Sequence, residues 1–313
     1  MKLLRSVCLV LLGGAFVRCA LADEPLLLGV LEAQPEPNAS GRVPATTHLR
    51  LGFQYQRDTW KAICEGKSSS RRNDGCAIER PNDYRDWSVL FNGQMLGSLQ
   101  TRGWRNSEYY SLTGALTIVT SSVPTVDDPV APFTSWVGEA TRRPLVAVSG
   151  VPPRQAGPVW YRETPAGDDT AAVWPVFKAR VPTIPNCRFD DDGKPLGAAR
   201  PSAPSDVSVF DRVRLSQGGH LLGVRAKEVE HCDEVGSFAS DIWVMKAANG
   251  PAFALEGFDT TGWPYSLSLL DVGAFAPDAS VQAVFFYAGY NEDGYVIYYD
   301  GFRRNARFTW GYH

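Results

Sequence analysis

The stretch that decides the fold runs from Ser266 to His313 and reads SLSLLDVGAFAPDASVQAVFFYAGYNEDGYVIYYDGFRRNARFTWGYH. It contains an apolar run, a polar loop, a second run, an Asn-Glu-Asp-Gly turn, a third run, an Asp-Gly turn and a fourth run. Val, Ile, Tyr and Phe favour strands, whereas Asn, Asp and Gly favour the tight turns between them. We therefore predict four consecutive antiparallel strands in this stretch.

Similar short runs recur through the rest of the chain, bounded by Gly, Asn, Asp or Pro, and they also predict strands. No window of helical length has apolar residues at three-and-four spacing without an interrupting Pro or Gly, so no amphipathic helix is predicted. The 22 Pro and 29 Gly indicate many tight turns, as in sandwich and propeller folds. The clearest predicted strands are 87–91, 115–120, 207–215, 221–226, 242–245, 281–287 and 295–299.

An aromatic-led strand followed by an Asn-Gly or Asp-Gly turn occurs three times, at 87–93 (WSVLFNG), 243–250 (WVMKAANG) and 295–301 (YVIYYDG). Each copy predicts a β-hairpin, and their spacing suggests a repeat of about 50 residues. We therefore predict an all-β, β-propeller-like domain of about five or six blades of antiparallel strands over residues 46–313. The alternative is two β-sandwiches, divided within the Pro-rich stretch 190–205.

Residues 266–313 resemble the last repeat of FG-GAP type, integrin-alpha-like β-propeller proteins, a family found among secreted bacterial proteins. In that family a loop with the pattern D-x-D-x-D-G-x-x-E holds calcium through its carboxylates. Of these positions, only Asp278 keeps a carboxylate in this degenerate cation loop. Calcium takes about six to eight oxygen ligands. The resemblance therefore implies the propeller architecture, while the residues disfavour a bound calcium, and we expect no cofactor or metal. The five positions hold Ala274, Ala276, Asp278, Ala279 and Gln282.

The amino terminus has the pattern of a secretory signal peptide. Lys2 and Arg5 precede an apolar run of limited length, and small residues lead up to a cleavage site after Ala22. We predict a signal peptide over residues 1–22, an amino-terminal tail over 23–45, and a secreted or periplasmic location. The apolar run is too short for a transmembrane helix and Arg18 interrupts it, so we predict no membrane span.

Removal of residues 1–22 would leave four cysteines, Cys64, Cys76, Cys187 and Cys232. An even number in an exported chain predicts disulfides, here two. We favour Cys64 with Cys76 and Cys187 with Cys232, because the partners of each pair then share one polar, irregular stretch. A zinc site would require closely spaced Cys or His pairs, and only His231 and Cys232 are close.

No HExxH zinc motif, G-x-S-x-G nucleophile motif or phosphate-binding glycine loop is present. The net charge of −3 disfavours a nucleic-acid partner. We therefore predict an exported, non-enzymatic binding protein for a protein or glycan partner, with its catalytic residues, if any, unknown. The alternative is a secreted polysaccharide hydrolase on a propeller scaffold, because such enzymes bring two carboxylates together from distant blades.

Overall fold

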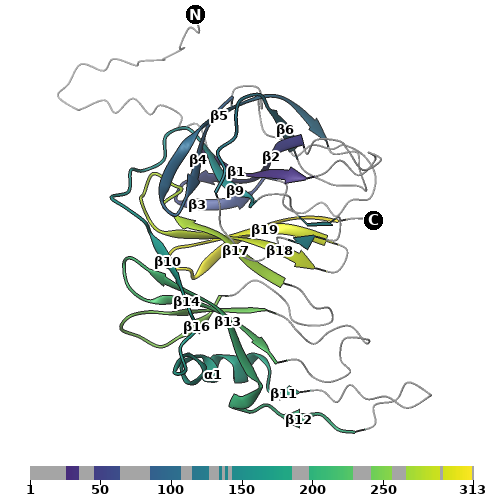
Figure 1. Cartoon of the computed structure of the whole chain (residues 1–313), viewed down its shortest axis with the longest axis vertical. Helices are drawn as coiled ribbons and strands as arrows, with labels where there is room; N and C mark the ends of the chain where they lie inside the picture. The colour runs from purple at the N-terminus through teal and green to yellow at the C-terminus, as the bar shows by residue number, and fades with distance from the viewer. Residues whose placement is uncertain are drawn as a thin grey trace, which may run out of the picture.

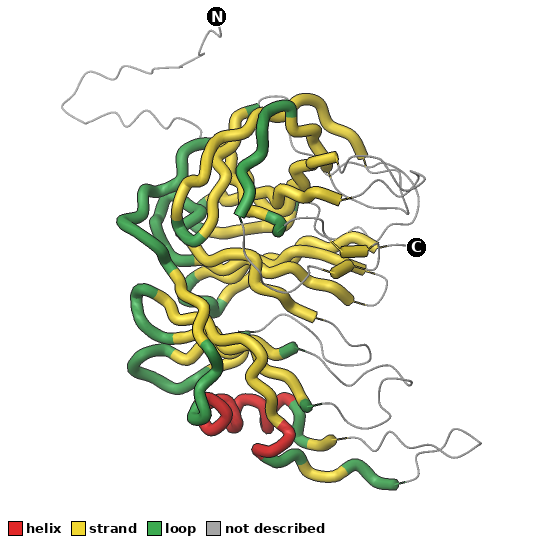
Figure 2. The backbone as a smooth tube through the Cα atoms, viewed as in Figure 1, coloured by secondary structure: helices red, strands yellow, loops and turns green. Residues whose placement is uncertain are grey.

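The structure is a computed structural model, which describes residues 26–34, 46–63, 85–106, 115–126, 134–135, 138–139, 143–184, 197–227, 241–255, 266–289 and 292–311. Antiparallel β-sheets dominate this part of the chain, as predicted (Figures 1 and 2). The predicted signal peptide and the four cysteines of the predicted disulfides lie outside the described residues.

The amino-terminal sheet has seven strands in the order β1-β9-β4-β5-β6-β2-β3. Because β1 also pairs with β2, the pairings form a circuit through six strands, and β2 pairs in addition with β3. Leucine, valine and tryptophan side chains from these strands form one of the buried clusters. The strands are β1 (Leu26–Gln34), β2 (Thr46–Gln56), β3 (Thr59–Ala62), β4 (Asp86–Phe91), β5 (Gln94–Asn106), β6 (Ala115–Val119) and β9 (Leu145–Ser149).

The central sheet is formed by the stretch quoted first, and its four strands follow one another in sequence order, as predicted. Successive side chains of a strand point to opposite faces, and both faces of this sheet are buried. Phe286 packs against the amino-terminal sheet, whereas Phe285 packs in the opposite direction. The strands are β17 (Ser266–Gly273), β18 (Gln282–Gly289), β19 (Glu292–Tyr299) and β20 (Arg304–Gly311).

The helix-side sheet packs against the other face of the central sheet. Its outer face is partly covered by helix α1 (Asp169–Arg180), whose Val173 and Phe177 are fully buried against it. Pro175 lies inside this helix, which is why the sequence pattern did not predict it. The sheet consists, in spatial order, of β10 (Trp160–Glu163), β13 (Val207–Leu215), β14 (His220–Ala226), β15 (Ile242–Lys246) and β16 (Phe253–Ala254).

Short elements complete the described structure. They are the pair β7 (Thr134–Ser135) and β8 (Gly138–Glu139), the pair β11 (Thr183–Ile184) and β12 (Arg200–Pro201), and the 3-10 helix η2 (Pro204–Asp206).

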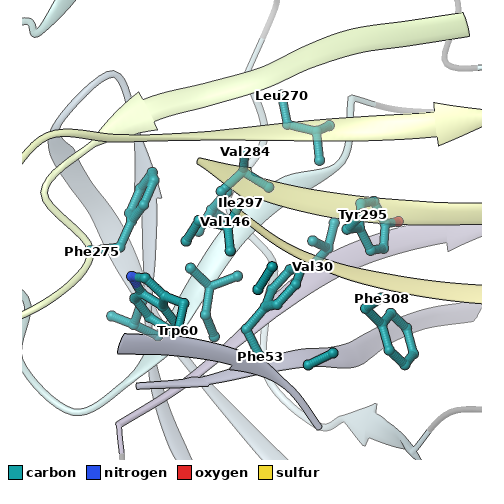
Figure 3. Packing of buried hydrophobic residues seen from close by; sticks show 14 of the residues in the cluster. Val30, Phe53, Trp60, Val146, Leu270, Phe275, Val284, Tyr295, Ile297 and Phe308 are labelled. Carbon is teal, nitrogen blue, oxygen red and sulfur yellow. The ribbon is translucent and has the colours of Figure 1, made fainter. Parts of the chain in front are cut away.

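The molecule is therefore a stack of layers: the amino-terminal sheet, the central sheet, the helix-side sheet and α1 (Figure 1). Figure 3 shows the first of these interfaces, where Phe53 and Trp60 of the amino-terminal sheet face Phe275, Ile297 and Phe308 of the central sheet and its loop.

Each of the seven predicted strands coincides with an observed strand, and each of the three predicted hairpins joins two observed strands. In two of these hairpins, Asn92-Gly93 and Asp300-Gly301, both turn residues have positive φ, as the sequence pattern requires. The hairpins belong to three sheets with different strand orders. The all-β class is therefore confirmed, and propeller blades are not shown.

Two boundaries differ from the sequence analysis. Residues Leu26–Gln34 of the expected amino-terminal tail form β1, whose fully buried Leu27, Leu28 and Val30 make it part of the core. Strands β10 and β13, on either side of residues 190–205, pair in one sheet. That stretch therefore does not divide two separate sandwiches.

The predicted turn over Asn-Glu-Asp-Gly was wrong for its described residues, because Glu292, Asp293 and Gly294 lie within β19. A Cβ on Gly294 would come within 2.4 Å of the Phe308 carbonyl oxygen in β20. The glycine therefore allows a close approach of two strands.

Candidate functional site

Asp278, the predicted remnant of a cation loop, lies between β17 and β18. Its Oδ1 accepts a hydrogen bond from the Ser280 backbone N–H (3.1 Å), and its Oδ2 accepts one from the Ser280 hydroxyl (2.9 Å). Gln282 Nε2 donates to the same hydroxyl (2.8 Å), and its Oε1 accepts from the Phe275 backbone N–H (2.8 Å). Hydrogen bonds among these side chains and the backbone thus hold the loop in place. Burial, together with the charge of Asp278, raises the pKa of the Tyr55 hydroxyl.

Two of the other aligned positions of this loop serve the core, whereas Ala279 is exposed. Ala274 and Ala276 are buried, and Ala276 packs in the cluster between the amino-terminal and central sheets. Across the described ranges, no group of three or more His, Cys, Asp or Glu residues is placed to hold a metal ion.

One concave feature in the described residues is a groove of about 540 Å³ beside helix α1. The last two turns of α1 form one wall, β16 forms the second, and the turn between β19 and β20 forms the third. Seven of the nine lining residues are apolar, and the exposed lining is divided almost equally between polar and apolar atoms. The groove is lined by Pro175, Val176, Ala179, Arg180, Ala252, Phe253, Ala254, Phe302 and Arg303.

Two arginines give this groove its charge. Arg180 comes from the last turn of α1, and Arg303 follows the Asp-Gly turn of the central sheet. The Arg303 guanidinium carbon lies 4.7 Å from the ring centre of Phe253, a cation-π distance that holds the arginine over the groove wall. None of the described residues that line the groove is an aspartate or a glutamate. The groove therefore combines apolar surface with positive charge.

A second polar feature is an ionic cluster on the outer face of the helix-side sheet. Arg212 of β13 lies at its centre: its Nε donates to Glu163 (3.1 Å), and its Nη1 donates to the buried Asp169 at the start of α1 (2.6 Å). Arg214 Nε donates to the other Glu163 oxygen (2.7 Å). The cluster therefore ties β10 and β13 to the helix.

His220 borders this cluster, with its Nε2 3.1 Å from Arg212 Nη2 and 3.5 Å from a Glu163 oxygen. Partial burial and the charge of Arg212 lower the pKa of the His220 imidazole. The hydrogen bond from Arg214 holds the pKa of the Glu163 carboxyl below its ordinary value. A lowered pKa does not suit the Glu163 carboxyl to donate a proton as a general acid.

Asp271 and Asp241 are buried carboxyls whose pKa is raised by burial. Both are bound by protein groups: Asp271 accepts from Trp160 Nε1 (2.9 Å), and Asp241 accepts from Arg225 (2.8 Å) and the Leu267 backbone N–H (3.1 Å). Neither residue lines the groove. They therefore belong to the packing of the sheets.

The sequence analysis did not identify the groove residues. Arg180 lies on a helix that was not predicted, and Phe253 lies on a strand of two residues, below the length at which alternation can be recognised. Only Arg303 carried a signal, because it follows a predicted Asp-Gly turn.

No helix in the described residues has the length and apolar character needed to cross a membrane. Comparison of the chain with protein-family models, curated proteins and solved structures found no match.

Proposed function

We propose that the protein is an exported, non-enzymatic binding protein and that an acidic partner docks in the groove between α1, β16 and the β19–β20 turn. The observation that carries this proposal is the set of lining residues, in which Arg180 and Arg303 accompany seven apolar residues and no aspartate or glutamate. An acidic group entering such a groove gains charge-assisted hydrogen bonds from guanidinium groups while its apolar neighbours bury surface.

The lining favours binding over glycoside cleavage. A glycosidase of the usual kind places two carboxyls about 5 to 9.5 Å apart across the scissile bond, one of them protonated. The described lining of the groove contains two arginines and no carboxyl, and the described acids with a raised pKa are buried in the sheets. A secreted polysaccharide hydrolase thus receives no support from the described residues.

Export and the two disulfides are part of the same proposal. The signal-peptide pattern over residues 1–22 supports secretion or a periplasmic location. The even number of cysteines that remain, Cys64, Cys76, Cys187 and Cys232, supports two disulfides in an oxidising compartment.

The test compares an acidic peptide probe, short polyglutamate, with an acidic glycan probe, oligogalacturonate. We expect wild-type protein to bind at least one probe, and we expect Arg180→Gln and Arg303→Gln each to weaken binding about threefold, because an exposed ion pair contributes up to about 1 kcal/mol. The double variant should weaken binding about tenfold, and higher salt should reduce wild-type affinity. Isothermal titration calorimetry measures each effect.

Arg154→Gln provides the matched control, because Arg154 is exposed and lies outside the groove. It should bind like wild type. The proposal would be abandoned if wild-type protein bound neither probe, or if the double variant bound as tightly as the control.

A further inference from the structure

The groove runs along the open edge of a sheet. Strand β16 is the last strand of the helix-side sheet, with β15 on one side and no strand on the other within the described residues. Val244 of β15 lies opposite Ala254, and Met245 lies opposite Phe253. One step further, the Leu255 backbone N–H donates to the Trp243 carbonyl (2.8 Å).

This register sets the direction of the Ala254 backbone. Opposed residues in antiparallel strands alternate between hydrogen-bonded and non-hydrogen-bonded pairs. Because Leu255 is bonded to Trp243, Val244 and Ala254 form a non-hydrogen-bonded pair. The N–H and C=O of Ala254 therefore point away from β15, towards the groove that Ala254 lines. In the described part of the chain, neither group has a hydrogen-bond partner.

The walls of the groove suit an added strand. Helix α1 lies over one face of the helix-side sheet and the central sheet lies over the other, so Arg180 and Arg303 flank the edge from opposite sides. Side chains of an extended peptide also point alternately to opposite sides. One set would reach the α1 wall, and the other would reach the wall formed by Phe302 and Arg303.

We propose that the ligand of this groove is an extended acidic peptide segment of a partner protein, which pairs with β16 through the outward N–H and C=O of Ala254. Carboxylates of the peptide meet Arg180 and Arg303, and its apolar side chains pack on Phe253 and Val176. This inference rests on the proposed function and narrows it to one class of partner. A saccharide lacks the regular N–H and C=O pattern that a strand edge recognises.

The experiment uses a short fluorescent peptide in which Glu alternates with Val, and fluorescence anisotropy measures its affinity for the full chain. Methylation of the peptide backbone nitrogens keeps charge and composition while removing the donors. We expect this change to weaken binding about fivefold, because the peptide donor to the Ala254 carbonyl is lost and a strand-edge hydrogen bond contributes modestly. A Lys-Val peptide of the same length should not bind measurably.

Ala254→Pro removes the outward N–H without breaking a bond to β15, since edge strands accept Pro at such positions. We expect it to weaken binding of the Glu-Val peptide about fivefold. Arg154→Gln, which lies outside the groove, should bind this peptide like wild type. Circular dichroism shows whether each variant is folded, and the methylated peptide tests the same hydrogen bonds on unaltered protein.

The outcomes separate this inference from the proposed function. If the Glu-Val peptide and its methylated form bind equally and Arg180→Gln weakens the binding of both, the groove binds acidic ligands and strand addition is wrong. The same conclusion follows if only oligogalacturonate binds. If no acidic probe binds, both proposals fail. If sedimentation shows a dimer that Ala254→Pro dissociates, the edge pairs with a second copy of this chain and the partner peptide is excluded.

Discussion

Asp271 joins three sheets through one carboxylate oxygen. Its Oδ1 accepts hydrogen bonds from the Asn92 backbone N–H (2.8 Å), Trp160 Nε1 (2.9 Å) and the Val272 backbone N–H (2.8 Å). Asn92 belongs to the amino-terminal sheet, Trp160 to the helix-side sheet and Val272 to the central sheet. Burial raises the pKa of the Asp271 carboxyl from 3.8 to about 6, against these hydrogen bonds and the nearby charge of Arg143.

The raised pKa makes stability depend on pH. Between pH 3.8 and about 6 the folded protein holds a proton on Asp271 that the unfolded chain has released, so the free energy of unfolding falls as pH rises through this window. The loss is on the order of 3 kcal/mol for a shift of this size. It is complete above the folded pKa.

Asp271→Asn should remove this dependence. The amide oxygen can still accept the three hydrogen bonds and carries no charge, so we expect a higher free energy of unfolding than wild type at about pH 8 and a flatter profile below about pH 6. Urea unfolding at a series of pH values measures both. Asp278→Asn, in an exposed loop, should keep the wild-type profile. A profile for Asp271→Asn that parallels wild type would contradict the assignment.

At the scale of elements, the sequence predicted those whose signal is local. Runs such as that in β18 (Gln282–Gly289) are β-branched and aromatic, and the Asn92-Gly93 turn has the residues that its positive φ values require. Helix α1 could not be recognised, because Pro175 interrupts it and buried contacts of Val173 and Phe177 hold it in place. Helix α1 is therefore stabilised by tertiary contacts, which produce no recognisable helical periodicity in its sequence.

The candidate site escaped prediction for a related reason. Its walls come from three elements that are distant in sequence, one of them the two-residue β16. Single arginines and a single phenylalanine are common on any surface. Only the stacking of the sheets brings Arg180, Phe253 and Arg303 together.

A substitution at Gly294 tests whether β19 and β20 approach each other too closely for a side chain. A Cβ at this position would lie 2.4 Å from a backbone oxygen, which cannot move without displacing its strand. We expect Gly294→Ala to lower the free energy of unfolding by about 2 kcal/mol or more. Gly52→Ala is the matched control, because its Cβ would make an ordinary contact at 3.7 Å. Chemical denaturation measures both, and equal stability of the two variants would refute the steric explanation.

At the scale of the whole molecule, a buried ion pair of the amino-terminal sheet contacts the central sheet. Arg50 donates from Nε (2.7 Å) and Nη2 (3.1 Å) to Glu32, and Tyr295 donates its hydroxyl to the same carboxylate (2.5 Å). The Arg50 guanidinium carbon also lies 4.0 Å from the Trp310 ring centre. Burial, together with Glu32, raises the pKa of the Tyr295 hydroxyl well above its ordinary value.

Substituting one member of this pair should lower the free energy of unfolding more than substituting both members. Arg50→Met leaves the Glu32 carboxylate buried with Tyr295 as its donor, and we expect a loss of about 3–5 kcal/mol in the free energy of unfolding. Adding Glu32→Gln removes the unpaired charge and should restore part of that loss. Thermal and urea unfolding of both single variants and the double variant give the coupling energy. Additive effects would show that the two side chains do not stabilise each other.

The order of the layers differs from the order of the chain. The central sheet is built from residues 266–311, which leave the ribosome after every strand of both neighbouring sheets. Until then, the apolar surfaces around Phe53 and Trp243 have no covering layer. A chain that ends before the central sheet thus exposes two apolar sheet faces at once. Chaperones that bind exposed apolar surface would be needed to prevent its aggregation until β17–β20 are synthesised.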